Sequence, residues 1–383
     1  MKNWIQDTPK AVLHDHLDGG LRVSTLIELA ELQGYKNLPS SEKSELLAWI
    51  EPKPNKSLAI NLEAWDHTIA VMQDADSIYR VTMEALEDLA NDGVVYAELR
   101  FAPLVHCQDG LDPNQVVDAV LNGIKDGTKK YDILSGAILC AMRHLNNSQN
   151  VVKLCIENTD VLAFDLAGPE VGFSALNHQD AIAIAHQNNI NITLHADWEV
   201  PEGIHEVIVD LKSNRIGHGS QIVNDYMNTN DGLKFKNPAA KFVYDNNIPL
   251  ELCPTSNMQC GSCKSISEHP FKKLYDDGFN VTINTDNRLM SNITMSQEVN
   301  KLVESFTFTQ EEILQITKNT IEAANVFSKK HKRKVVLIAS LNQISTFNKS
   351  YLYNSFISLN EKKIRFNNKN LLFIDKYMYV CRN

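Results

Sequence analysis

The stretch Leu13-His14-Asp15-His16-Leu17-Asp18-Gly19, near the start of the chain, is the most informative part of the sequence. It follows the apolar pair Ala11-Val12, so we expect a short buried strand that runs into a loop. Alternate side chains of a strand share one face, so His14 and His16 point the same way. Two imidazoles on one face, at the end of an inner strand, supply half of a metal site. Such pairs also occur at ordinary strand ends, so the interpretation depends on the rest of the chain.

Eight short apolar or alternating runs have the character of buried strands. Helical patterns lie between most of them, and the clearest has Asp112 as its cap and Pro113 at its first position. The expected strands are 11–17, 94–101, 134–142, 161–166, 191–195, 214–218, 248–253 and 280–285. Examples of the expected helices are 113–130, 177–189, 202–212 and 268–277, and a longer helical block, about 58–92, separates the first two strands.

Eight strand-then-helix units in one chain are typical of a closed parallel barrel. The sequence therefore predicts the α/β class: a (β/α)8 TIM barrel over residues 1–327, with a helical insertion after strand one. An open doubly wound sheet is the alternative, but no expected strand is followed by a Gly-rich phosphate turn. In a barrel, functional residues gather at the carboxyl ends of the strands.

The charge of the chain is unevenly distributed. Residues 328–383 hold 12 Lys and Arg against 2 Asp and Glu, whereas residues 1–327 hold 25 against 45, a net charge of −20. An acidic body of this kind argues against nucleic acid as a partner. There is no apolar run of about 18 residues, so no membrane span is expected. Seven scattered cysteines and an N-terminus without an apolar leader fit a cytoplasmic protein, and nothing indicates an oligomeric state.

Polar residues follow several of the expected strands, where a barrel places its site. His14 and His16 end strand one, His195 ends strand five and Asp286 follows strand eight. Three imidazoles and one carboxylate form a ligand set that suits zinc. Bound Zn²⁺ lowers the pKa of a coordinated water toward ~7, which gives hydroxide at neutral pH. His218, at the end of strand six, is placed to act as the base that orients this hydroxide.

Five motifs, in the right order, resemble those of adenosine deaminases, a family of the amidohydrolase superfamily of zinc barrels. They are His14-Asp15-His16-Leu17-Asp18-Gly19-Gly20-Leu21-Arg22, Asp165-Leu166-Ala167-Gly168, Arg215-Ile216-Gly217-His218-Gly219, Leu252-Cys253-Pro254-Thr255-Ser256-Asn257 and Asn284-Thr285-Asp286-Asn287-Arg288-Leu289-Met290-Ser291. The similarity covers about residues 8–327, and the last motif is similar to that of a bacterial branch.

The resemblance implies hydrolytic deamination. Hydroxide would attack C6 of adenosine or 2′-deoxyadenosine, and loss of ammonia would give inosine or 2′-deoxyinosine. It also implies one zinc ion per chain, with the hydroxide oriented by His218 and the metal held by His14, His16, His195 and Asp286.

The same resemblance implies how a purine nucleoside would be bound. Asp18 would bind a ribose hydroxyl, the backbone N–H of Gly168 would meet a purine ring nitrogen, and His16 would also face the substrate. The helical block after strand one would cover the purine as a lid. Leu62 and Trp65 are its candidate apolar contacts, although both are of a type that is equally common in a core.

The chain departs from the family at the general acid. The family's strand-five motif is His-Ala-Gly-Glu, and its Glu protonates the purine ring. Here the residues are His195-Ala196-Asp197-Trp198-Glu199, so Trp198 occupies the expected position of the acid. Either Glu199 reaches the site through a shifted loop, or Asp197 substitutes with a shorter reach, or the acid is missing. We choose Glu199 because its length matches the family's acid.

Two further departures concern Asn287 and the C-terminal segment. Many family members have a second aspartate where this chain has Asn287, whose amide is also able to hydrogen-bond a purine nitrogen. Residues 328–383 form a basic tail rich in Asn and Lys that matches nothing in the family. Its composition favours a solvated tail over a site for an anionic partner, and an altered reading frame would produce a similar composition.

Three alternatives stay open at the level of sequence. A related amidohydrolase would deaminate another aminopurine. A catalytically impaired barrel would bind purine nucleosides without useful turnover, which the Trp198 anomaly motivates. A different superfamily member would hydrolyse an amide or a phosphoester, but strand four ends in Asp165 rather than in the Lys or Glu that bridges two metals, so one metal is simpler.

Overall fold

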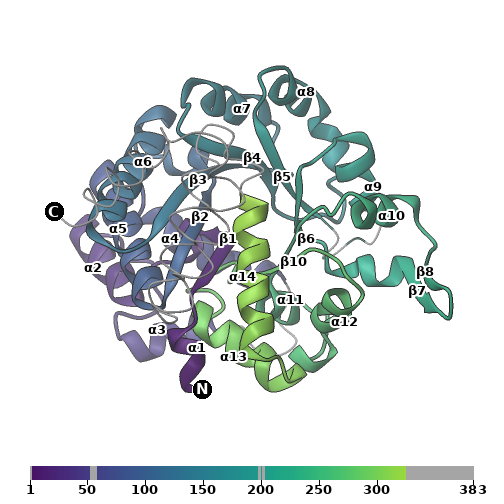
Figure 1. The fold of residues 1–383 in the computed structure, drawn as a ribbon. Coiled ribbons are helices and arrows are strands. Elements are labelled where there is room, and N and C mark those ends of the chain that lie inside the picture. The colour runs from purple at the N-terminus through teal and green to yellow at the C-terminus, as the bar shows by residue number, and fades with distance from the viewer. Residues whose placement is uncertain (1, 52–57, 197–199, 201–202, 325–383) are drawn as a thin grey trace, which may run out of the picture. The chain divides into compact units, whose positions relative to one another are not determined.

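Eight parallel strands form a sheet with helices around it (Figure 1). The computed structural model describes residues 2–51, 58–196, 200 and 203–324. The strands are β1 Lys10–His16, β2 Val94–Phe101, β3 Leu134–Met142, β4 Val161–Ala167, β5 Asn191–Ala196, β6 Arg215–His218, β9 Leu250–Leu252 and β10 Val281–Ile283. Their order in the sheet follows their order in the chain. All seven residues of β1 are buried, as expected for a parallel strand covered on both faces.

The sheet closes on itself between β10 and β1. The N–H of His16 donates to the carbonyl of Asp286 at 2.7 Å, and the N–H of Asp286 donates to the carbonyl of His14 at 3.0 Å. The side-chain oxygen of Asn284 accepts from the N–H groups of Leu13 and His14 at 2.9 and 3.1 Å. These contacts complete the predicted (β/α)8 barrel, so the predicted fold class is confirmed. They also bring the ends of β1 and β10 together at one end of the barrel.

Between β1 and β2, where the sequence predicts a helical insertion, the described residues form four α-helices. They are α2 Val23–Gln33, α3 Lys43–Ile50, α4 Leu58–Ala70 and α5 Ala75–Asn91. The predicted block at 58–92 therefore comprises α4 and α5. Helix α5 begins after Asp74, whose side chain caps the N–H of Ser77 at 2.8 Å. It packs on β2 and on α6 Pro113–Lys130, which the sequence predicts with the same bounds.

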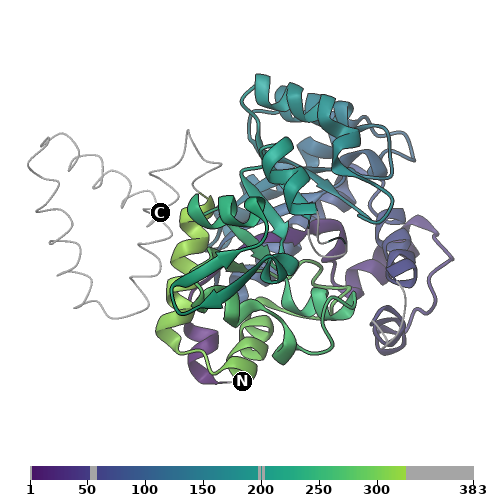
Figure 2. The same cartoon turned by 90° about the vertical axis from the view of Figure 1, so that its right-hand side faces the viewer.

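The remaining helices connect the later strands or end the barrel. They are α1 Asn3–Asp7, α7 Ser148–Glu157, α8 Gln179–Gln187, α9 Gly203–His205, α10 Pro238–Asp245, α11 Pro254–Gln259, α12 Phe271–Asp276, α13 Met295–Phe306 and α14 Gln310–Ala324. Helix α14 packs on β1 and β10, and α1 lies beside α13 (Figure 2). Helices from the two ends of the described chain thus pack near the place where the barrel closes. No helix within the described ranges is long and apolar enough to cross a membrane.

Some boundaries differ from the prediction. The helix expected at 268–277 begins only at Phe271, because His269 precedes a proline and is extended, with φ −66° and ψ 135°. The helix expected at 202–212 is α9, which continues as a π-helix over Glu206–Asp210. An antiparallel hairpin of β7 Tyr226–Thr229 and β8 Gly232–Phe235 was not predicted.

Candidate active site

The four side chains that the sequence predicts as metal ligands lie together at the carboxyl ends of the strands. His14 and His16 come from β1, His195 from β5, and Asp286 from the residues after β10. All four are buried, and one nitrogen or oxygen from each lies within 4.8 Å of the others. Nε2 of His16 lies 3.2 Å from Nε2 of His195, and Nε2 of His14 lies 3.2 Å from Oδ1 of Asp286.

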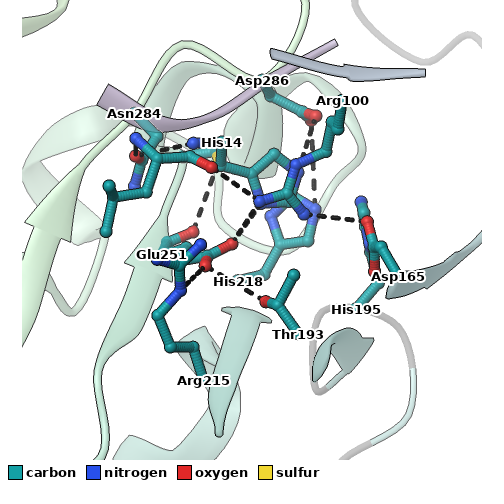
Figure 3. A network of polar contacts seen from close by, with 12 residues as sticks. His14, Arg100, Asp165, Thr193, His195, Arg215, His218, Glu251, Asn284 and Asp286 are labelled. Atoms are coloured by element: carbon teal, nitrogen blue, oxygen red, sulfur yellow. Dashed lines mark hydrogen bonds and ion pairs between the residues drawn. The ribbon is translucent and has the colours of Figure 1, made fainter. Parts of the chain in front are cut away.

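The outer ring nitrogens of two of these histidines donate to carboxylates (Figure 3). Nδ1 of His14 lies 3.1 Å from Oε2 of Glu251, and Nδ1 of His195 lies 3.0 Å from Oδ1 of Asp165. A neutral imidazole that donates through Nδ1 has its lone pair on Nε2. The lone pairs of His14 and His195 therefore point inward, as metal-binding histidines require.

Two buried arginines hold the carboxylates in place. Arg100 donates to Oδ2 of Asp165 at 2.9 Å and to Oε2 of Glu251 at 2.6 Å (Figure 3). Arg215 donates to Oε1 of Glu251 at 2.7 Å and also pairs with Glu98. With Asp286, this network contains four carboxylates against two guanidinium groups. Its excess of two negative charges matches a divalent cation at the site.

The protonation states of His16, His195 and Asp286 also fit a metal. Burial would lower the pKa of His14, but Asp286 and Glu251 raise it. Burial lowers the pKa of His16 to about 3, and burial lowers the pKa of His195 as well, although Asp165 opposes it. Burial would raise the pKa of Asp286, but the adjacent histidines, His14 above all, hold that pKa well below its usual range. Two neutral imidazoles and an ionised carboxylate therefore converge at neutral pH.

A further observation tests whether a metal fits this arrangement. Nε2 of His14 is buried, and although Oδ1 of Asp286 lies 3.2 Å away, the two atoms are not aligned for a hydrogen bond. A buried nitrogen in this position is satisfied well by a ligand placed between the side chains. Three imidazole nitrogens and one carboxylate oxygen suit a borderline divalent metal, so the residues present fit the predicted ion.

His218 lies beside this cluster, at the end of β6. Its Nε2 is 3.9 Å from Oδ2 of Asp286, and that oxygen also accepts from Oγ of Ser256 at 2.5 Å. His218 and Asp286 have φ values of +66° and +59°, a left-handed conformation that L-residues rarely adopt. Gly217 leaves room for the neighbouring histidines, since a Cβ there would come within 3.2 Å of the His14 ring. Backbone strain of this kind is a pointer to function.

A cavity of about 630 Å³ opens above the cluster. Helix α4 forms part of its wall through Trp65, whose ring lies edge-on to His16 with centroids 5.6 Å apart. The cavity is large enough for one small molecule with two fused rings and a sugar. None of the described residues that line it is Lys or Arg.

Three more predicted site residues line this cavity: Asp18, Gly168 and Asn287. Oδ2 of Asp18 accepts from the N–H of Ala102 at 3.2 Å and lies 3.4 Å from Nε2 of His106. Within the described chain, Oδ1 of Asp18 and Oδ1 of Asn287 are buried without a hydrogen-bond partner. Gly168 has φ +95°, a conformation that favours glycine. The cavity therefore presents unsatisfied polar atoms to a ligand.

A comparison with protein families identifies the chain. The family model described as "Adenosine deaminase" matches residues 9–340. The adenosine deaminase of Mycobacterium sp. (strain JLS) is 44% identical over 330 residues, which cover 84% of this chain and 91% of that protein. The chain belongs to the adenosine deaminase family. The family resemblance predicted from the motifs is thereby confirmed.

Solved structures of similar fold include an adenine deaminase and a protein solved with the nucleotide IMP. The adenine deaminase from Arthrobacter aurescens has a TM-score of 0.78 at 22% identity and covers 87% of this chain and 98% of its own, which supports the fold alone. Arabidopsis ADAL, solved with IMP, has a TM-score of 0.74 at 27% identity and covers 89% of this chain and 98% of its own.

Asp197, Trp198 and Glu199 lie outside the described residues, as does the side chain of Leu62 in α4. On the far side of this segment, the N–H of Val200 donates to Oε2 of Glu170 at 3.0 Å. The choice of Glu199 as the acid therefore stays a prediction.

The sequence analysis assigned no role to several residues that contact the predicted residues of this adenosine deaminase site, although Ser256 and Asn257 end one of the family motifs. Arg100, Glu251, Asn257, Ser256 and Arg143 all lie next to predicted site residues, and Arg143 donates to the carbonyl of His195 at 2.5 Å. One signal was available for Arg100 and Glu251, because a charged residue inside a short buried strand needs a partner. The partners themselves come from distant strands.

Proposed function

We propose that this protein hydrolyses adenosine and 2′-deoxyadenosine to inosine and 2′-deoxyinosine, with release of ammonia. One zinc ion per chain would be held by His14, His16, His195 and Asp286. The observation that carries the proposal is the convergence of inward-facing imidazole nitrogens and a carboxylate at the floor of a cavity of about 630 Å³. When bound there, zinc supplies hydroxide at neutral pH by lowering the pKa of water.

The residues beside the ligands would orient the attacking oxygen. Nε2 of His218 lies 3.9 Å from Oδ2 of Asp286, and both residues line the cavity. An oxygen beside this pair of atoms would be hydrogen-bonded by His218 while Ser256 holds the carboxylate. Such alignment of the nucleophile with C6 of the purine would lower the activation barrier, because the reacting groups need not be reoriented during the reaction.

The lining of the cavity favours a nucleoside over a nucleotide. The free Oδ1 of Asp18 would accept a hydrogen bond from a ribose hydroxyl, and a phosphate at that place would meet a carboxylate of like charge. A phosphate site is usually built with Arg or Lys, which the described lining lacks. The N–H of Gly168 and the amide of Asn287 would hydrogen-bond the purine ring, and Trp65 and Leu62 would cover it.

Glu199 would protonate the purine ring as general acid, with Asp197 as the alternative. General acid catalysis contributes about 10²–10⁴-fold in rate, so the choice is open to a direct assay. Replacing Glu199 with Gln should lower kcat by that range and leave the zinc content unchanged, whereas Asp197→Asn should have a smaller effect. The opposite ranking would assign the role to Asp197.

A panel of substrates tests the proposal as a whole. Ammonia release is measured with adenosine, 2′-deoxyadenosine, adenine and AMP at equal concentrations. We expect turnover of the two nucleosides, with loss of most of the nucleoside activity in Asp18→Asn. Preferred turnover of adenine would favour a deaminase of another aminopurine. Tight binding of inosine with zinc present and no ammonia from any of the four would favour the impaired barrel that Trp198 motivates.

The proposal includes the organisation and location of the chain. We assign residues 1–327 to the catalytic barrel and residues 328–383 to an appended basic tail, which lies outside the described residues. We place the protein in the cytoplasm, since the six described cysteines are all free thiols. A small purine nucleoside is the partner that the cavity fits.

A further inference from the structure

A row of buried polar groups leads from His218 away from the cavity. Nδ1 of His218 lies 3.1 Å from Nδ2 of Asn257, and Oδ1 of Asn257 lies 3.1 Å from Nε2 of His269. Nδ1 of His269 lies 3.1 Å from the backbone nitrogen of Phe271, the first residue of α12. Asn257 is fully buried and His269 is 3% exposed. Every gap along this row has the length of a hydrogen bond.

The direction of the row is fixed at its far end. A backbone N–H only donates, so Nδ1 of His269 must accept from Phe271. Burial lowers the pKa of His269 to about 3, so its ring is neutral at physiological pH and carries one proton. That proton is therefore on Nε2, which donates to Oδ1 of Asn257.

The orientation of the Asn257 amide then determines which ring nitrogen of His218 carries the proton. Its oxygen only accepts and its nitrogen only donates, so with Oδ1 facing His269 the NH₂ group must face His218. Nδ1 of His218 then accepts. The proton of a neutral His218 ring is left on Nε2, which faces Oδ2 of Asp286 at 3.9 Å.

We propose that Asn257 and His269 are positioning residues that hold His218 as its Nε2–H tautomer. The tautomer of His218 does not depend on the proposed function, but its consequence in catalysis rests on that function. In this tautomer His218 donates a hydrogen bond to the attacking oxygen and has no lone pair there to take up a proton. His218 would then orient the oxygen, the role that the family resemblance implies, by donating a hydrogen bond and not by taking up a proton.

The geometry around Asp286 supports this division of roles. Ser256 lies next to Asn257 in α11, and its hydroxyl holds Oδ2 of Asp286 at 2.5 Å. Adjacent residues of one short helix thus fix the two groups on either side of the proposed oxygen position. His218 also has φ +66°, a strained backbone conformation for an L-residue.

Nuclear magnetic resonance of protein labelled with ¹⁵N in histidine tests the inference without an activity assay. Ring nitrogens with and without a proton have well-separated resonances, and loss of a signal in His218→Gln assigns the ring. We expect Nε2 to carry the proton and Nδ1 to be bare, in both zinc-loaded and metal-free protein. A proton on Nδ1 in the unaltered protein would overturn the inference.

Two substitutions test the row itself. Asn257→Asp replaces the amide with an acceptor of the same shape, so the proton should appear on Nδ1 of His218, and kcat should fall about 10–100-fold with a smaller change in KM. His269→Gln still accepts from Phe271 and still donates to Asn257, so it should keep the Nε2–H pattern. His269→Phe does neither and should give a mixture of tautomers.

The outcomes separate this inference from the proposed function. If Asn257→Asp leaves Nδ1 of His218 bare, the positioning role is wrong whatever the enzyme does. If the tautomers respond as expected but no substrate releases ammonia, the row stands and the proposed deamination fails. A folded Asn257→Asp protein with full activity and a displaced proton would reject the catalytic consequence alone.

Discussion

At the scale of single residues, Glu251 is the carboxylate that accepts most of the buried hydrogen bonds next to the predicted metal ligands. Its two oxygens accept from Nδ1 of His14 at 3.1 Å, from Arg100 at 2.6 Å, from Thr193 at 3.1 Å and from Arg215 at 2.7 Å. Burial would raise the pKa of this carboxyl, but the two guanidinium groups hold the pKa far below its usual range. One carboxylate therefore fixes a metal-facing histidine and balances two buried cations.

We predict that Glu251→Gln is strongly destabilising. The amide keeps the shape of the side chain, but its NH₂ group would face donors, and the two arginines would lose a counter-charge. Breaking a buried ion pair in this way costs about 3–5 kcal/mol in the free energy of unfolding. Urea denaturation measures it, with Glu311→Gln, an exposed position on α14, as the matched control. Equal midpoints for the two variants would contradict the account.

The sequence predicted the side chains that face the cavity better than the buried side chains that hydrogen-bond to them. His14, His16, His195 and Asp286 each stand at the end of an apolar run, a local pattern. The partners of Arg100 are 65 and 151 residues away along the chain, so no local pattern is able to name them. The general acid is the clearest case, since the sequence places Trp198 at the family's position and the structure does not describe that segment.

At the scale of elements, α4 connects the insertion after β1 to the cavity. Its Trp65 contacts His16 edge-on, and a Cβ at Gly19 would lie 2.8 Å from the Trp65 ring, so the approach of α4 to the loop after β1 needs a glycine. The helix would thus cover a bound purine through an aromatic face. The strands and α6 agreed with the sequence because caps and buried runs are local, whereas the β7–β8 hairpin was missed because its strands are polar and largely exposed.

We predict that Trp65→Ala raises KM for adenosine about tenfold, which is 1.4 kcal/mol, and changes kcat less. The lost ring contacts substrate before and during the reaction alike, so binding suffers more than the chemical step. Steady-state kinetics measures both constants. Trp4→Ala, in the half-buried α1, is the control that should lower stability without changing KM. A similar rise of KM in both variants would exclude a specific role for Trp65.

Helices α11 and α13 are joined by a buried carboxyl. Glu298 of α13 accepts from the N–H and the hydroxyl of Thr255 in α11 at 2.8 and 2.5 Å. Burial raises its pKa to about 7 from the usual 4.5. Because the folded protein holds this proton more tightly than the unfolded chain, the contribution to stability is complete below about pH 4.5 and is lost as the pH rises through 7.

We therefore predict that Glu298→Gln flattens part of the pH dependence of stability. Relative to this variant, the unaltered protein should lose a few kcal/mol, at most about 3, between pH 4.5 and 7.5. Thermal unfolding at a series of pH values measures the difference. Parallel stability curves for the two proteins over that interval would show that Glu298 does not titrate there.

At the scale of the whole molecule, the barrel ends where α14 packs against β1 and β10. Oγ1 of Thr317 in α14 donates to the carbonyl of Pro9 at 3.1 Å, and Nε2 of Gln310 lies 3.2 Å from Oγ1 of Thr8. The last described helix thus contacts the residues that lead into the first strand. Residues 1–327 and 328–383 carry opposite net charges. None of the barrel contacts named here involves a residue of the second segment.

We predict that a chain ending at Phe327 keeps the zinc content, kcat and melting temperature of the full chain. Every residue to which a role has been assigned precedes this point, as does the described part of α14, Gln310–Ala324. Metal analysis, kinetics and thermal unfolding of the two chains check this. A large drop in melting temperature on truncation would mean that the tail belongs to the folded domain.

The most direct test of the central claim is a zinc titration of metal-free protein with ammonia release from adenosine as the readout. The account predicts that activity rises in proportion to added zinc and stops rising at one equivalent per chain, and that Asp286→Ala abolishes both the activity and the tight binding. Full turnover of adenosine without metal, or a rise that continues to two equivalents, would contradict the single-metal site formed by His14, His16, His195 and Asp286.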